Sequence, residues 1–145
     1  MSSLPSQSQI VVTDPRPNDY RGLTRLAGEY GWHIHFLTCG RAAIQFARPR
    51  AADLWMINIR LPEMSGFDLL EIVRGRVPGV PVFLVADRYD SEEERRACGC
   101  GAALYLCKDA DRSIDCQQLL QFLLADDRVE RVNEVPYPII SQAED

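Results

Sequence analysis

The chain lacks an excess of positive charge and long apolar runs. Its 16 Lys and Arg residues are outnumbered by 21 Asp and Glu residues, and a formal net charge of −5 disfavours nucleic-acid binding by this chain alone. No apolar stretch reaches the roughly 18 residues of a membrane span, and the start MSSLPSQSQ has neither the basic nor the apolar part of a signal peptide. We therefore expect a soluble, cytoplasmic protein that binds no membrane.

Metal-ligating residues are also scarce. The two histidines, His33 and His35, have no Asp, Glu or Cys placed to complete a metal site, and we interpret them as structural. The five cysteines are an odd number, and the close pair Cys98 and Cys100 has no second pair or nearby histidine. Reduced thiols fit this pattern better than disulfides or a structural metal.

The length and the apolar pattern predict one α/β domain. A chain of 145 residues of which 46% are hydrophobic forms an ordinary core. Strand-length apolar runs alternate with amphipathic segments, which predicts βα units and a parallel sheet covered on both faces. The expected strands are 9–13, 32–37, 54–58, 82–85 and 103–107, and the expected helices are 19–29, 41–48, one from 65 or 66, one from 91, and 115–125. We expect a disordered tail over 1–8, the domain over 9–125 and a C-terminal tail over 126–145.

The last two helices differ in character. The segment SEEERRA predicts a helix with a capping box that begins at Ser91 and has almost no apolar face. Helix 115–125 has an apolar arc wider than one core-facing stripe needs, which suggests that part of it meets a partner. The candidate interface residues are Leu120, Leu124, Arg95 and Arg96. The apolar segment VPYPII in the tail either folds back over this helix or binds a partner, unless it is a frayed end.

The residues that end the strands are the candidates for function, because ligands of doubly wound sheets bind beyond the carboxyl ends of the strands. Asp14 follows the first strand, and Asn58 ends the third. Ala86 and Asp87 follow the fourth strand, and Lys108 follows the fifth. An acid, an amide, an alanine and a lysine are therefore expected at one edge.

Four segments together resemble the receiver domain of two-component response regulators, the CheY-like family, from about residue 9 to 124. They are GWHIHFLTCGRAAI (31–44), DLWMINIRLPEMSG (53–66), VPVFLVAD (80–87) and GAALYLCK (101–108). The resemblance implies a flavodoxin-like, doubly wound (βα)5 fold with a parallel five-stranded sheet in the order 2-1-3-4-5. It also implies a Mg²⁺-binding acidic pair, an aspartate that accepts phosphate, and a Ser or Thr and a lysine that contact the phosphoryl group.

This sequence departs from that implied set at most positions. The phosphoacceptor position falls on Asn58, whose neutral amide cannot form the acyl phosphate that a carboxylate forms. The acidic pocket is reduced to Asp14, beside either Thr13 or Pro15. The hydroxyl position falls on Ala86, and only Lys108 matches. The loop positions are Arg60, Pro62 and Gly66.

A divalent ion usually needs more than one carboxylate, so we expect no cofactor, or at most weak Mg²⁺ binding at Asp14. We hypothesise that Lys108, with Arg60 or Arg16, pairs with Asp14 and the Asn58 side chain in place of the metal. Tyr105 falls at the family's switch aromatic, although it could equally be a half-exposed strand residue.

The favoured function is an atypical receiver domain that is not an enzyme and does not take phosphate in the normal way. It would bind a protein partner (a kinase, an output domain or a second copy in a homodimer) through the face of the helix from 91, strand 103–107 and helix 115–125. One alternative is phosphorylation on a non-standard acceptor such as Asp14. Another is a cofactor binder on a flavodoxin-like fold, although TDPRPND offers no Gly-rich phosphate loop.

Overall fold

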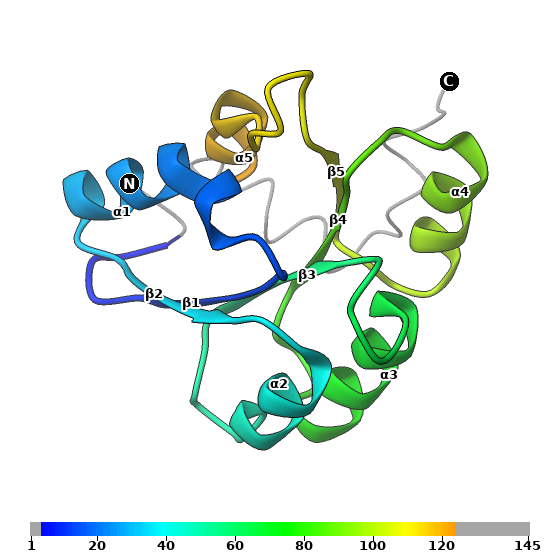
Figure 1. Cartoon of the computed structure of the whole chain (residues 1–145). Helices are drawn as coiled ribbons and strands as arrows, with labels where there is room; N and C mark the ends of the chain where they lie inside the picture. Colours follow the sequence, from blue (N-terminus) through cyan, green and yellow to red (C-terminus); the bar gives the residue numbers. More distant parts are fainter. Residues whose placement is uncertain (1–3, 124–145) are drawn as a thin grey trace.

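Five parallel strands form the centre of the molecule in the order β2-β1-β3-β4-β5 (Figure 1). The computed structural model describes residues 4–123. The strands are β1 (Gln9–Thr13), β2 (His33–Leu37), β3 (Leu54–Asn58), β4 (Val82–Ala86) and β5 (Leu104–Cys107). The helices are the 3-10 turn η1 (Pro17–Tyr20), α1 (Arg21–Tyr30), α2 (Gly40–Phe46), α3 (Gly66–Arg76), α4 (Ser91–Gly99) and α5 (Cys116–Leu123). The strand order confirms the predicted doubly wound fold.

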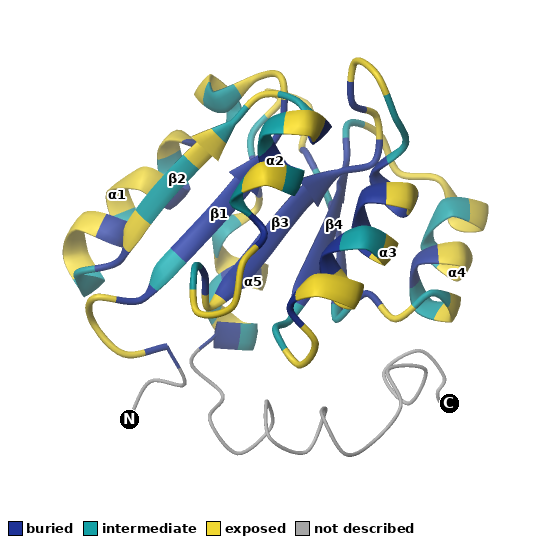
Figure 2. Ribbon diagram, turned by 90° about the horizontal axis from the view of Figure 1, so that it is seen from below, coloured by how far each residue is buried: buried dark blue, intermediate teal, exposed yellow. Residues whose placement is uncertain are grey.

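The central strands have the most apolar sequences because both of their faces are covered. Every residue of β3 and β4 is buried, and Figure 2 shows them as dark ribbons in the middle of the sheet. The edge strand β2 is only partly buried, in agreement with its mixed sequence HIHFL. This pattern is the one expected of a parallel sheet with helices on both sides.

The sheet divides the core into two halves, one on each of its faces, and helices cover both (Figure 1). Helices α1 and α5 pack on one face, where the core contains Ile10, Leu23, Met56, Phe83 and Leu119. Helices α2 and α3 pack on the other face over Trp55, Ile57, Leu70 and Leu84. Helix α4 lies beside β5 and contributes a single buried residue, Ala97, which agrees with its polar sequence.

The predicted cap of α4 was wrong by one residue. The carboxylate of Asp90 accepts hydrogen bonds from the backbone N–H groups of Glu92 and Glu93, at 2.9 and 3.2 Å. Ser91 is instead the first helical residue. A carboxylate is also favoured at this point because it faces the positive end of the helix dipole.

Residues 4–8, which the sequence predicts to be part of a disordered tail over 1–8, contact the domain. The indole Nε1 of Trp32 donates to the carbonyl oxygen of Leu4 at 3.0 Å, and Leu4 is buried. The backbone N–H of Gln7 donates to the carbonyl of Gly31 at 2.7 Å. These contacts attach the segment to the end of α1, because burying Leu4 against Trp32 offsets the entropy of ordering it.

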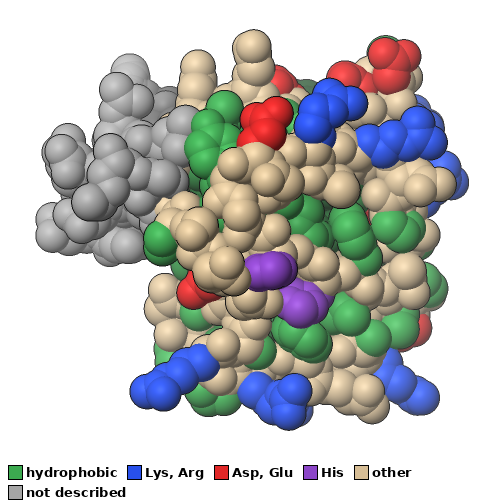
Figure 3. All heavy atoms as spheres, turned by 90° about the vertical axis from the view of Figure 1, so that its left-hand side faces the viewer, with side chains coloured by type: hydrophobic (Ala, Val, Ile, Leu, Met, Phe, Trp, Pro, Cys, Tyr) green, Lys and Arg blue, Asp and Glu red, His purple; other side chains and the backbone are tan. Residues whose placement is uncertain are grey.

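The two histidines lie on the β2 edge and are hydrogen-bonded to glutamines. The Nε2 atom of His33 is 2.9 Å from Oε1 of Gln7, and Nε2 of His35 is 2.6 Å from Oε1 of Gln9. Figure 3 shows the two imidazoles next to each other on this face. The contacts agree with the structural interpretation of both residues.

Of two further predictions, one concerns residues that the structure describes and the other concerns residues outside that range. Over residues 4–123, no helix combines the length and the apolar character needed to cross a bilayer. The predictions for the end of helix 115–125, for Leu124 and for the segment VPYPII lie outside the described residues.

Candidate functional site

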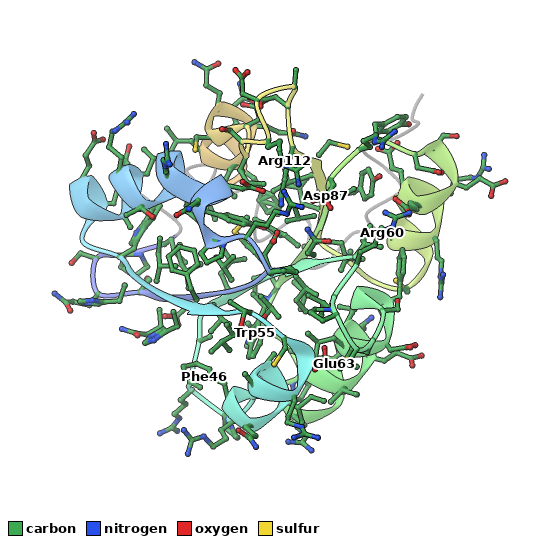
Figure 4. The ribbon with its side chains drawn as sticks, in the orientation of Figure 1. Phe46, Trp55, Arg60, Glu63, Asp87 and Arg112 are labelled. Carbon is green, nitrogen blue, oxygen red and sulfur yellow. The ribbon has the colours of Figure 1, made fainter. Side chains whose placement is uncertain are left out.

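The carboxyl ends of β1, β3, β4 and β5 bring five polar side chains together. Asp14 follows β1, Asn58 is the last residue of β3, Asp87 follows β4 and Lys108 follows β5. Asp19, in the turn η1, completes the group. Figure 4 places Asp87 at the carboxyl end of β4, between Arg60 and Arg112 in that view. Parallel strands end at the same edge of a sheet, so residues far apart in the sequence meet there.

Lys108 is the centre of this group. Its Nζ atom lies 3.0 Å from Oδ2 of Asp14, 2.8 Å from Oδ2 of Asp19 and 3.0 Å from Oδ1 of Asp87. The side chain of Lys108 is 1% exposed, as is that of Asp14, whereas that of Asp87 is 36% exposed. An ammonium group has three donors, and each of them has a carboxylate acceptor here.

Asn58 links two of these carboxylates. Its Nδ2 donates to Oδ2 of Asp14 at 2.8 Å and to Oδ1 of Asp87 at 3.1 Å. Its Oδ1 accepts from the backbone N–H of Arg60 at 2.7 Å. The hypothesis that Asn58 pairs with Lys108 was therefore wrong: the amide nitrogen and the ammonium both donate to Asp14 and Asp87, and the amide oxygen accepts from the backbone of Arg60.

Asp14 is enclosed by donors. Besides Lys108 and Asn58, it accepts from the backbone N–H of Arg16 at 2.8 Å and from the hydroxyl of Tyr20 at 2.7 Å. Burial, followed by the charge of Asp14 and its hydrogen bond, raises the pKa of Tyr20 well above its usual range. Tyr20 therefore stays protonated at neutral pH, and its hydroxyl donates to Asp14.

The carboxylate of Asp87 and the ammonium of Lys108 stabilise each other's charge. Burial alone would raise the pKa of Asp87, but the hydrogen bonds from Lys108 and Asn58 and the charge of Lys108 outweigh it and lower that pKa. Burial alone would lower the pKa of Lys108, but hydrogen bonds to Asp19, Asp14 and Asp87 raise it. Both groups are charged at neutral pH.

The predicted arginine contacts were only partly right. The guanidinium of Arg60 pairs with Glu93 of α4 at 3.1 Å, and only its backbone N–H reaches Asn58. Arg16 likewise contributes its backbone N–H to Asp14. Both arginines follow strand ends, where the chain turns away from the site, so their main chain faces the acids and their side chains are exposed.

Three other predicted positions lie at the site without joining the network. Ala86 is buried and offers only a methyl group. Thr13 is buried, and its Oγ1 has no hydrogen-bond partner in the described part of the chain. Pro15 is exposed on the following turn. The acidic pocket therefore depends on Asp14 together with Asp19 and Asp87, not on a neighbour of Asp14 in the sequence.

The loop after Asn58 is held at both ends. Gly66 begins α3 beside β3, where a Cβ atom would collide with the backbone oxygen of Asn58. The carboxylate of Glu63 accepts from the backbone N–H groups of Gly40 and Arg41 at 3.1 and 2.9 Å, so the loop is attached to the start of α2. Pro62, directly before Glu63, is exposed.

Tyr105 is buried, not half-exposed. Its hydroxyl accepts from the backbone N–H of Asp90 at 3.2 Å and lies 3.5 Å from Oε1 of Glu93, and the ring meets Tyr89 edge-on. Burial raises the pKa of Tyr105. Through Glu93, Tyr105 is connected with the Arg60 ion pair, so α4 is attached both to β5 and to the loop after Asn58.

The interface candidates differ in their exposure. Arg95 is largely exposed and only 3.8 Å from Glu92 of the same helix. The guanidinium of Arg96 lies 4.0 Å from the ring centroid of Phe67, so it packs against α3. Leu120 packs in part against the core between α5 and the sheet. Of the three described candidates, Arg95 is the most available to a partner.

Sequence reasoning missed the roles of Asp19 and Tyr20, and it noted Asp87 without assigning it a partner. Asp19 and Tyr20 were read as the start of a helix, whereas they lie in a 3-10 turn that directs both side chains toward Asp14 and Lys108. The available signal was PRPND, since prolines before an acid favour a turn over a regular helix start.

The residues do not fit the divalent ion that the family resemblance implies. Oxygens of Asp14, Asp19 and Asp87 already point to the ammonium of Lys108, and Oδ2 of Asp14 has three donors. Within residues 4–123, no group of three or more His, Cys, Asp or Glu residues is arranged to hold a metal ion. Lys108 is the cation that these three carboxylates contact.

The fold and the site define a class of protein. Residues 10–121 match the model of the response regulator receiver domain family. The match covers most of the chain, and the chain belongs to this family.

Curated relatives are regulators of which this chain corresponds to one part. The probable transcriptional regulatory protein TcrX of Mycobacterium tuberculosis is 33% identical over 88 residues, which are 61% of this chain and 37% of TcrX. The regulatory protein AtoC of Escherichia coli is 29% identical over 104 residues, which are 72% of this chain and 23% of AtoC. The chain thus spans well under half the length of both.

Solved structures show the same fold. A CheY-like receiver domain protein from Methanospirillum hungatei has a TM-score of 0.68 and 19% identity, with 89% of this chain and 96% of that chain covered. The non-phosphorylated HemR receiver domain from Leptospira biflexa has a TM-score of 0.67 and 22% identity, with 95% and 98% covered. At this identity the similarity establishes the fold alone.

Proposed function

We propose that this receiver domain signals through protein contacts and does not accept a phosphoryl group at the end of β3. The observation that carries the proposal is the side chain of Asn58 at the end of β3, where the family resemblance implies the phosphoacceptor. Its amide is engaged by Asp14, Asp87 and the backbone of Arg60. A neutral amide cannot attack phosphorus to form an acyl phosphate.

The surroundings of Asn58 support the proposal. Ala86, at the position of the family's hydroxyl residue, has no donor for a phosphoryl oxygen. The three donors of Lys108 are directed to carboxylates. An incoming phosphoryl group would meet three negative charges with one ammonium to balance them, and such repulsion in a partly buried site is large.

Asp87 is the residue that favours a second candidate function, phosphorylation on a non-standard acceptor. Its carboxylate is a neighbour of Lys108 and is 36% exposed, whereas that of Asp14 is 1% exposed and enclosed by donors. Asp14, the acceptor first considered, is thus inaccessible. Asp87 is accessible, and its carboxylate contacts Lys108 and Asn58.

The surface for the partner is the face of α4 and β5. Tyr89 is 62% exposed there and Arg95 is largely exposed, and aromatic and Arg side chains are the residues that dominate binding energy in interfaces. Tyr89 packs on Tyr105, which contacts Asp90 and Glu93. The partner is a protein, namely a kinase, an output domain or a second copy of the chain.

Incubation with acetyl phosphate and Mg²⁺, followed by intact-mass measurement, tests the absence of phosphorylation. The wild-type chain should gain no mass, whereas transfer would add about 80 Da. The Asn58→Asp variant, checked for folding by circular dichroism, is the matched gain-of-function control. Labelling of this variant alone would show that the wild type lacks only the carboxylate at position 58. If neither the variant nor the wild type is labelled, Ala86 and Lys108 also block transfer. Labelling of the wild-type chain would refute the proposal, and its loss in Asp87→Asn would identify Asp87 as the acceptor.

A further inference from the structure

A pocket of about 390 Å³ lies at the amino ends of β3 and β4, opposite to the edge of the sheet that holds Lys108. Leu54 and Phe83 of these strands line the pocket, together with Phe122 and Leu123 at the end of α5. The rings of Phe83 and Phe122 contact each other, with 5.0 Å between their centroids, so the pocket has an aromatic surface. Ligand pockets have volumes of about 300–1,000 Å³, so this one has room for a few side chains but not for a large cofactor.

The N-terminal segment 4–8 forms one wall of this pocket, and all five of its residues line it. The backbone N–H of Gln7 donates to the carbonyl of Gly31 at 2.7 Å, and the backbone N–H of His33 donates to the carbonyl of Ser8 at 2.8 Å. The wall is therefore held by the main chain. A pocket that is formed in advance reduces the entropy that binding costs.

The lining favours an uncharged, apolar occupant. Asp53 is the one charged residue among the lining residues that the structure describes, and its carboxylate already accepts from the backbone N–H of Gln9 at 2.8 Å. Most of the other lining residues are Leu, Pro or Phe. Binding of apolar side chains here would remove apolar surface from water on both partners.

The sequence after Leu123 contains such an occupant, the apolar segment VPYPII at residues 135–140. This segment has no charged residue, whereas six of the eleven residues in between, 124–134, are charged. Its two prolines favour an extended backbone, so less conformational entropy is lost when it binds. Extended segments that contain proline bind grooves lined by aromatic side chains in other proteins.

We infer that this pocket is the docking site of the chain's own segment 135–140. Because Leu123 lines the pocket, the segment has only to return to the point where it left the domain. Eleven extended residues reach up to about 36 Å, which is sufficient for that return. A segment tethered in this way has an effective concentration on the order of 1 mM, and a separate peptide of equal affinity must reach that concentration to displace it. The inference is independent of the proposed function, since the pocket lies at the opposite edge of the sheet.

NMR spectroscopy of the full chain tests the inference directly. In the wild type, the methyl groups of Ile139 and Ile140 should show nuclear Overhauser effects to the rings of Phe83 and Phe122. These contacts should be present when light scattering shows a monomer. Contacts that appear only together with a dimer would assign the pocket to the segment of a second copy and would overturn the inference, and so would the absence of these contacts.

Substitutions in the segment give a matched comparison. The triple variant Tyr137→Ser, Ile139→Ser and Ile140→Ser should shift the amide signals of the pocket residues, because the docked side chains are removed. The control Ser141→Ala combined with Gln142→Ala changes the same part of the chain outside the apolar segment and should leave these signals as in the wild type. Pocket signals that are equal in the wild type and the triple variant would contradict docking.

A synthetic peptide of residues 133–145 provides a second measurement. It should bind the triple variant with a dissociation constant of about 0.1 mM and the wild type about tenfold more weakly, because the tethered segment competes at about 1 mM. Phe122→Ala, which removes a ring from the pocket, should weaken peptide binding by the triple variant at least tenfold. Pro81→Asp should do the same by adding a charge, and it keeps the carbonyl that accepts from the backbone N–H of Trp55, so the two substitutions perturb the fold differently. No binding by the triple variant, equal binding by the wild type, or binding that neither pocket substitution weakens would overturn the inference.

Discussion

The Asn58→Asp substitution, which restores the residue expected of a phosphoacceptor, should destabilise this domain. The Nδ2 atom of Asn58 donates to Oδ2 of Asp14 at 2.8 Å and to Oδ1 of Asp87 at 3.1 Å. A carboxylate oxygen in its place would face two other carboxylates at similar separations. The substitution thus exchanges two hydrogen bonds for two repulsive contacts.

The size of the effect follows from these contacts. A hydrogen bond to a charged acceptor contributes about 1.5–3 kcal/mol, so loss of both removes about 3–6 kcal/mol. Two like charges about 4 Å apart at an effective dielectric constant of 20 repel each other by about 4 kcal/mol. The new carboxyl avoids this repulsion by remaining protonated. Repulsion from only one of the two carboxylates, at about 1.4 kcal/mol per pKa unit, is enough to raise its pKa by about three, so the carboxyl stays protonated up to at least about pH 7.

The sign of the pH dependence is determined by that shift. A carboxyl whose pKa is higher in the folded state favours folding when it is protonated, and this contribution is lost as the pH rises through the folded pKa. The stability of the variant relative to wild type should therefore fall by about 1.4 kcal/mol per pH unit between about pH 4 and pH 7.

Urea denaturation of both chains from pH 4.5 to 8, followed by tryptophan fluorescence, measures this difference, since Trp55 is fully buried and reports unfolding. Asn58→Ala is the matched control, because it loses the same donors without adding a charge and should show a loss that does not depend on pH. A variant with aspartate at this position that matches wild type within about 1 kcal/mol at pH 5 and at pH 7 would refute the reasoning.

Three further predictions concern the same region. Lys108→Met should lower the free energy of unfolding by about 3–5 kcal/mol in urea, because it leaves three carboxylates without their cation; a loss under 1 kcal/mol would show that the ammonium is dispensable. Asp90→Ala should lower it by about 1 kcal/mol, since it removes the cap of α4, whereas Ser91→Ala should have little effect, and equal effects of the two would contradict the assignment of the cap. At alkaline pH the domain should lose stability: the pKa values of Lys108 and Tyr20 are raised in the folded state, so their contribution is complete below about pH 10 and is lost as the pH rises through the folded values. Absorbance at about 295 nm should show that Tyr20 ionises only together with unfolding, and its ionisation in the folded domain would argue against the hydrogen bond to Asp14.

The sequence by itself determined the order of the elements and the residues that end the strands. The continuous apolar runs of β3 and β4 identified the central strands, because only residues buried on both faces can be apolar throughout. Parallel strands end at one edge of a sheet, which was sufficient to predict from the sequence that Asp14, Asn58 and Lys108 lie near one another.

Only the tertiary structure decided which side chains pair. Asp19 is five residues from Asp14, and its approach to Lys108 depends on a 3-10 turn that periodicity does not distinguish from the first turn of a helix. Asp87 was visible as the residue after β4, but its hydrogen bonds with Asn58 and Lys108 depend on the direction of the loop, which long-range packing determines. The apolar pattern of a strand is local and can be read from neighbouring residues in the sequence. The partners of a buried charge depend instead on elements from distant parts of the chain that pack around it.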